Sequence, residues 1–89
     1  MKFKDLKFED RSETHGENAI QAWVDFPNGY SVSVVRHNGS YGNKQGLYEI
    51  GAFYGERMAM IDRWHDQVKG YLDENGVEEE LEYLSNYKK

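Results

Sequence analysis

The chain has 89 residues and a net charge of −5, lacks cysteine, and is 38% hydrophobic and 15% aromatic. The length predicts one domain, and the missing cysteines exclude disulfides and cysteine-bound metals. No basic patch is visible and no apolar run approaches the ~20 residues of a membrane span, so we expect neither nucleic acid nor membrane as a partner. The charged N-terminus is unlike a signal peptide, which predicts a cytoplasmic protein.

An N-terminal arm, residues 1–18, precedes the predicted sheet. Its first nine residues mix charged side chains with Phe3, Leu6 and Phe8, a pattern compatible with a short edge strand or with an anchored arm. The polar remainder of the arm is typical of a loop or a partly disordered link.

A hairpin around Pro27-Asn28-Gly29 is predicted to open the sheet, which spans residues 19–64. A two-residue Asn28-Gly29 loop would place Pro27 where a strand residue donates a backbone hydrogen bond, which proline cannot do. A type I turn followed by a left-handed Gly29, which makes a bulge, avoids this conflict and is the turn we favour.

The bulged turn also sets the pairing of the two strands, 19–26 and 30–37. It brings six apolar residues to one face of the hairpin, in the pairs Phe26–Tyr30, Val24–Val32 and Ala22–Val34. Trp23 falls on the opposite face, across from Ser33.

A third strand is predicted at 47–54 and a fourth at 58–64, joined by a turn at Gly55. A two-residue turn would pair Ile50 with Ile61, and a three-residue turn would pair Ala52 with Met60. Both registers stay open.

Two helices are predicted within residues 66–87. Val68, Tyr71 and Leu72 have the i, i+3, i+4 spacing of a helix that Asp66 would cap, and residues 73–76 either break that helix or begin a new one. Helical spacing returns downstream, at Val77, Leu81 and Leu84. The expected fold is therefore α+β: an antiparallel three- to four-stranded meander followed by two C-terminal helices packed on one face.

The glycine-rich loop 36–46 is the best candidate for a ligand site. Four side chains there could contact a ligand: Arg36, His37, Tyr41 and Lys44. Backbone amides in such loops can approach an anion closely, although neither a P-loop nor a dinucleotide fingerprint is present. This pattern gives the hypothesis of a small-ligand or nucleotide-sequestering module; the alternative is a loop whose glycines only serve turns.

Catalytic signals are weak. The three histidines are far apart, no H-x-x-x-H or G-x-S-x-G pattern occurs, and no carboxylate pair has a recognisable acid–base setting. We therefore expect no metal, no cofactor and no enzymatic activity. The acidic run 73–82 could mimic phosphates, but a solvated helix face is the interpretation we favour.

Aromatic residues point to protein binding, because tyrosine and tryptophan are favoured at interfaces. If helices cover the apolar face of the sheet, Trp23 and Val35 are left exposed together as a partner patch or a homodimer seam. Alternatively, Phe3 and Phe8 of the arm cover them.

Several short stretches resemble a group of small uncharacterised proteins encoded by bacteriophages and prophages. They are Phe26-Pro27-Asn28-Gly29-Tyr30, Ser33-Val34-Val35-Arg36, Tyr41-Gly42, Gly46-Leu47-Tyr48-Glu49, and Val68-Lys69-Gly70-Tyr71-Leu72 before an acidic helix. The resemblance covers roughly residues 19–87 and implies a phage context and a fold, without a mechanism. Our leading hypothesis is a non-enzymatic interaction protein that binds a host or phage protein.

Overall fold

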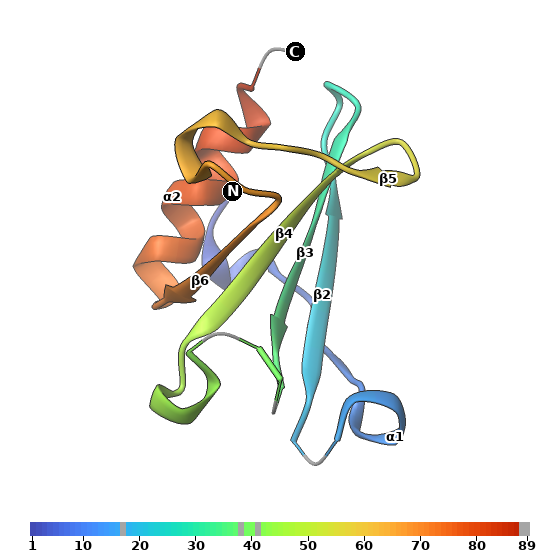
Figure 1. Ribbon diagram of the computed structural model, residues 1–89, viewed down its shortest axis with the longest axis vertical. Coiled ribbons are helices and arrows are strands. Elements are labelled where there is room, and N and C mark those ends of the chain that lie inside the picture. The colour runs from blue at the N-terminus through green and yellow to red at the C-terminus, as the bar shows by residue number, and fades with distance from the viewer. Residues whose placement is uncertain (17, 38, 41, 88–89) are drawn as a thin grey trace.

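The computed structural model describes residues 1–16, 18–37, 39–40 and 42–87. It shows an α+β fold in which an antiparallel sheet packs one face against a C-terminal helix (Figure 1). The strands are β1 (Glu9–Asp10), β2 (Ile20–Asp25), β3 (Tyr30–Arg36), β4 (Tyr48–Tyr54), β5 (Arg57–Met58) and β6 (Val68–Leu72). The helices are α1 (Ser12–His15), α2 (Glu74–Ser85) and the 3₁₀ turns η1 (Phe3–Asp5), η2 (Asn43–Gln45) and η3 (Asp62–Trp64).

The β2–β3 hairpin has the register that the bulged turn predicts. Val24 pairs with Val32, and Trp23 pairs with Ser33. Gly29 has a φ of +93°, and the amide of Phe26 donates to the carbonyl of Tyr30 at 2.8 Å. The proline therefore lies in the turn, outside the ladder, where its missing N–H costs nothing.

The sheet runs in the order β1-β2-β3-β4-β5, and β6 also pairs with β4. Both β5 and β6 lie along the same edge of β4: β5 at its C-terminal end, opposite Phe53 and Tyr54, and β6 further back, opposite the stretch from Tyr48 to Gly51. Among the described residues the sheet thus has six strands, two more than the upper limit we expected.

The predicted fourth strand, 58–64, is wrong beyond its first residue. The chain makes the two-residue turn and pairs Phe53 with Met58, but Ile50 then pairs with Lys69 of β6 and not with Ile61. Ile61 is instead buried in the core just before η3, whose Trp64 is also buried. Burial of these two side chains beneath α2 explains why the strand stops early.

The predicted helix starting near Asp66 is also wrong, because residues 68–72 form β6. A bulge interrupts the pairing of β6 with β4, so Val68 and Leu72 fall on opposite faces although they are four residues apart. The inserted residue turns a strand pattern into one that has helical spacing. The described residues 66–87 therefore form one strand and one helix where the sequence predicted two helices.

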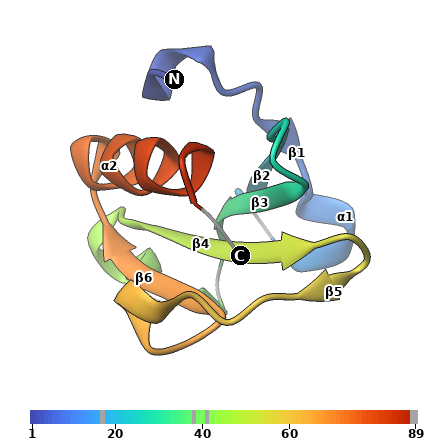
Figure 2. The ribbon, with the colours of Figure 1, turned by 90° about the horizontal axis from the view of Figure 1, so that it is seen from above.

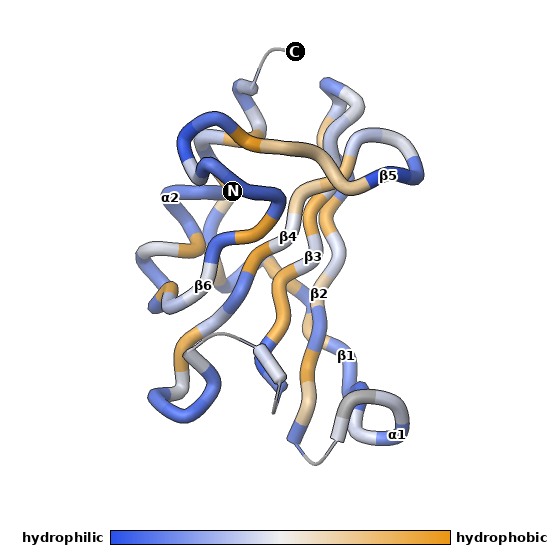
Figure 3. Tube along the Cα trace, viewed as in Figure 1, coloured by the Kyte–Doolittle hydropathy of each residue, from blue (hydrophilic) through white to orange (hydrophobic). Residues whose placement is uncertain are grey.

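Helix α2 begins where Asp73 accepts a hydrogen bond from the Gly76 amide at 2.7 Å, as an N-cap does. Its predicted apolar stripe, Val77, Leu81 and Leu84, is fully buried against the sheet. Figure 2 shows α2 lying over one face of the strongly twisted sheet, and Figure 3 shows the apolar residues distributed along the strands.

The first turn of the N-terminal arm, η1, packs beside α2, and Trp23 on the other face stays half exposed. Phe3 and Phe8 stack on Tyr48, with ring centroids 5.2 and 5.7 Å away. The Phe3 amide also donates to Glu78 of α2 at 2.6 Å. The arm is thus anchored on the core, and its β1 is the short edge strand beside β2.

Candidate functional site

The sheet face opposite α2 is the candidate site, and we call it the open face. Register and alternation place these side chains on it: Glu9, Gln21, Trp23, Asp25, Ser31, Ser33, Val35, Glu49, Phe53, Met58 and Val68. Helix α2 packs on the opposite face, against β3, β4 and β6. The face therefore combines strand rigidity with access to solvent.

Trp23 and Phe53 form the aromatic centre of the open face. Their strands, β2 and β4, flank β3, yet the ring centroids lie 5.3 Å apart with planes tilted by 48°. Strands separated by another strand are roughly 10 Å apart, so the rings must meet above β3. Only small side chains, Ser31 and Ser33, lie beneath them. This cover explains why Ser33 is only 7% exposed while Trp23 remains 50% exposed.

Met58 and Val68 extend the apolar surface toward the edge of the sheet. A Cβ at Gly51 would lie 3.6 Å from the Met58 methyl group and 3.7 Å from a Val68 methyl group, so both side chains lean over this glycine. Met58 is 42% exposed. The open face thus carries an apolar strip from Trp23 to Met58. A protein bound there would exclude water from these side chains.

The β1 end of the open face is polar and internally satisfied. Arg11 donates to Gln21 at 3.1 Å and to Glu9 at 3.2 Å. Gln21 in turn donates to Ser33 at 2.7 Å. This chain of side chains limits the apolar strip on one side.

Sequence reasoning identified Trp23 and Val35 on this face but missed Phe53 and Met58. The sequence did indicate Phe53. Ala52 and Tyr54 point to one face of a strand, so Phe53 between them must point to the other face. An apolar residue on the polar phase of a strand indicates a second buried or binding surface.

The predicted loop site does not join the open face. Arg36 lies on the α2 side of the sheet, where its guanidinium stacks over the Tyr48 ring at 4.9 Å. It also donates to the Tyr48 hydroxyl and to the Gly46 carbonyl, each at 3.3 Å. These contacts hold the loop against β4. They also occupy the Arg36 guanidinium, the group that an anionic ligand would need to bind.

The other loop residues are spread out. The His37 amide donates to the Ser40 hydroxyl at 2.9 Å, and His37 Nδ1 accepts from the Gly39 amide at 3.1 Å, which forms a tight local turn. Lys44 is exposed on η2. Tyr41, also predicted here, lies outside the described residues. The structure brings Trp23 and Val35 to one face and places Arg36 on the other.

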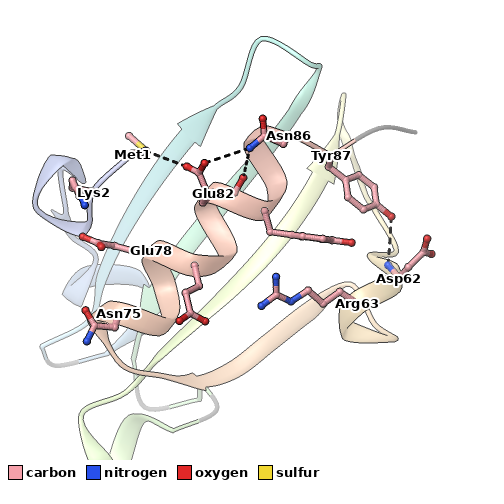
Figure 4. Close-up of a pocket in the computed structure, with 11 residues that line it drawn as sticks. Met1, Lys2, Asp62, Arg63, Asn75, Glu78, Glu82, Asn86 and Tyr87 are labelled. Carbon is pink, nitrogen blue, oxygen red and sulfur yellow. Dashed lines mark hydrogen bonds and ion pairs between the residues drawn. The ribbon is translucent and has the colours of Figure 1, made fainter.

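A second surface runs along the solvent side of α2, between the N-terminal residues and η3 (Figure 4). Arg63 lies over the Tyr83 ring at 4.8 Å and pairs with Glu80 at 3.4 Å. The Asp62 amide donates to the Tyr87 hydroxyl at 3.4 Å. Arg63, Glu80 and the Tyr87 hydroxyl of this surface therefore serve contacts within the chain.

The acidic residues of α2 are mostly used inside the fold. Glu78 accepts from the Phe3 amide, Glu82 faces the N-terminal amine at 3.9 Å, and Glu80 accepts from the Trp64 indole at 2.7 Å. Asp73 caps the helix. These contacts favour the solvated and structural interpretation over phosphate mimicry.

A tyrosine cluster adjoins this groove at Tyr87. Tyr30 packs against Tyr54 and Tyr87, with ring centroids 4.8 and 5.1 Å away. Burial, assisted by the neighbouring Tyr87, Tyr54 and Asp62, raises the pKa of the Tyr30 phenol above its ordinary value. The cluster therefore packs β3 and β4 against Tyr87, just beyond the C-terminal end of α2.

The chain matches no protein-family model, no curated protein and no solved structure. Among the described residues, no group of three or more histidines and carboxylates could hold a metal ion. The described helices include none that is long and apolar enough to cross a membrane.

Proposed function

We propose that this chain is a small, non-enzymatic interaction protein that binds a host or phage protein through its open face. The observation that carries the proposal is Trp23, half exposed and packed on Phe53 on the sheet face opposite α2. Exposed apolar patches on a rigid face are typical of binding surfaces, and tryptophan dominates many such interfaces. The phage context rests on the resemblance of the hairpin and loop sequences.

A pull-down from phage-infected or prophage-carrying bacterial lysate tests this function. The immobilised protein is compared with Trp23→Ser and with Tyr83→Ser, a matched aromatic truncation in the α2 groove, after both variants are shown to fold. We expect a partner retained by the protein and by Tyr83→Ser and lost from Trp23→Ser, because a central tryptophan often contributes 2 kcal/mol or more, roughly 30-fold in affinity. A partner that Trp23→Ser still retains would contradict the proposal.

The small-ligand hypothesis stays a prediction without a specific observation in its favour. One of the predicted loop cations, Arg36, already donates to Tyr48 and Gly46. A thermal-shift panel of nucleotides checks it, since a ligand that binds the folded state raises the melting temperature by mass action.

A further inference from the structure

The open face carries carboxylates beside its apolar strip. Register places Glu9 and Asp25 on it. Arg11 pairs with Glu9 and also donates to Gln21, so the charge of Glu9 is already balanced within the chain. The face thus offers a partner negative charge and apolar area together.

Asp25 is the carboxylate closest to the aromatic centre. It is exposed, follows Trp23 by two residues on the same side of β2, and forms no ion pair with any described residue. Residues two apart on a strand lie roughly 6.5–7 Å from each other on one face. A cation over the Trp23 ring would therefore be within reach of this carboxylate.

Aromatic faces attract cations as carboxylates do. The π-face of tryptophan is the strongest side-chain partner for a guanidinium or ammonium group, and the attraction grows when the contact excludes water. Trp23, Phe53 and Asp25 converge on the same part of the open face. Met58 and Val68 beside them favour an aliphatic neighbour for that cation.

A second copy of the chain fits this face less well. Pairing two open faces would bring two sets of carboxylates together, on molecules that each carry a net charge of −5. Like charges facing each other across an interface oppose association. Complementarity therefore favours a basic partner over self-association.

We infer that the open face docks a segment of a partner protein in which an arginine or lysine alternates with aliphatic residues. The cation lies against Trp23 and Asp25, and the aliphatic side chains lie along Phe53, Met58 and Val68. This inference rests on the proposed function and specifies the chemistry of its partner.

Two-dimensional NMR of the ¹⁵N-labelled protein provides a test with an internal control. The chain has two indole N–H groups: Trp23 is on the open face, and Trp64 is buried and donates to Glu80. Three capped peptides serve as probes: Leu-Arg-Ile-Arg-Leu, Leu-Gln-Ile-Gln-Leu and Leu-Glu-Ile-Glu-Leu. We expect the arginine peptide to move the Trp23 signal at about tenfold lower concentration than the glutamate peptide, with the Trp64 signal unchanged.

The Asp25→Asn substitution should lower the affinity for the arginine peptide about threefold, because only one charge is removed. It should leave the affinity for the glutamine peptide unchanged. Glu79→Gln, an exposed charge on α2, is the matched control and should change neither. Equal shifts from all three peptides would overturn the preference for a cation while leaving the open face as a binding surface. Shifts of the Trp23 signal with protein concentration alone, or no shift with any peptide, would overturn the inference.

Discussion

At the residue scale, Asn28 links the β2–β3 turn to the end of α2. Its Nδ2 donates to the carbonyls of Leu84 and Tyr87 at 2.8 and 3.1 Å, and its Oδ1 accepts from the Tyr30 amide at 3.0 Å. The Leu84 carbonyl also accepts from the Tyr87 amide at 3.1 Å, so Asn28 gives this last-turn carbonyl a second donor and gives the Tyr87 carbonyl one of its own. One asparagine thus fixes both the turn and the helix.

Asn28→Asp should destabilise the protein by about 2–3 kcal/mol, because it removes both donors and puts a negative charge at the negative end of the helix dipole. The free energy of unfolding in urea measures the loss. Asn75→Asp is the matched control: it places the same charge in the first turn of α2, where the dipole favours it, and should be neutral or slightly stabilising. Equal losses in both variants would contradict the role given to Asn28.

Glu80 is the second residue with a specific structural role. It is 5% exposed, accepts from the Trp64 indole at 2.7 Å and pairs with Arg63 at 3.4 Å. It therefore holds η3 against α2. That contact positions the segment between β5 and β6.

Glu80→Ala should cost about 2–3 kcal/mol of stability, since the buried indole N–H loses its acceptor. Glu80→Gln keeps an acceptor and loses only the charge, so its cost should be smaller, about 1 kcal/mol. Glu79→Ala, exposed on the same helix, should change stability by less than about 0.5 kcal/mol. Chemical denaturation followed by tryptophan fluorescence would rank the three variants, and a Glu80→Ala variant as stable as Glu79→Ala would refute the contact.

At the element scale, local chemistry predicts the hairpin and α2, whereas β5 and β6 depend on distant contacts. The Pro27-Asn28-Gly29 turn determines its own register through backbone geometry, and the stripe of Val77, Leu81 and Leu84 requires a helix. In β6, a bulge that forms only against β4 produces a helix-like spacing over five residues. No periodicity over so short a segment separates the two structures.

The candidate site divides in the same way. Alternation along β2 placed Trp23 on the open face, because a strand fixes the side of every residue. Phe53 was predictable from the same rule and was overlooked. That Arg36 is engaged by Tyr48 could not be predicted, since it depends on how the loop folds back on β4.

Gly42 and Gly46 of that loop have similar backbone conformations but different surroundings. Both have left-handed φ angles, +90° and +74°. A Cβ at Gly42 would lie 2.9 Å from Leu47 Cβ and 3.0 Å from Tyr71 Cα, whereas a Cβ at Gly46 would meet no atom within 4 Å. Gly42 is therefore required by contact between the loop and β6 as well as by its conformation.

Gly46→Ala should cost about 1 kcal/mol, from left-handed strain alone. Gly42→Ala should cost roughly 1–3 kcal/mol more, because loop and strand must separate. Thermal unfolding of the two variants measures the difference. Equal costs would mean that the loop does not pack on β6 as described.

At the scale of the whole molecule, the sheet has two faces with different roles. One face buries its apolar residues under α2 and the anchored arm, which supplies the stability of the fold. The other face keeps an aromatic pair and an apolar strip in contact with solvent. In a chain of 89 residues with one modest core, such a strip is costly unless a partner covers it.

Site-specific photo-crosslinking in infected cells tests most directly whether the open face is the binding surface. Benzoylphenylalanine replaces Met58 on the open face or Glu79 on α2; both positions are exposed and tolerate a large side chain. We predict a discrete adduct with a partner protein from position 58 and none from position 79. An adduct from position 79 alone, or equal adducts from both positions, would contradict the assignment of binding to the open face.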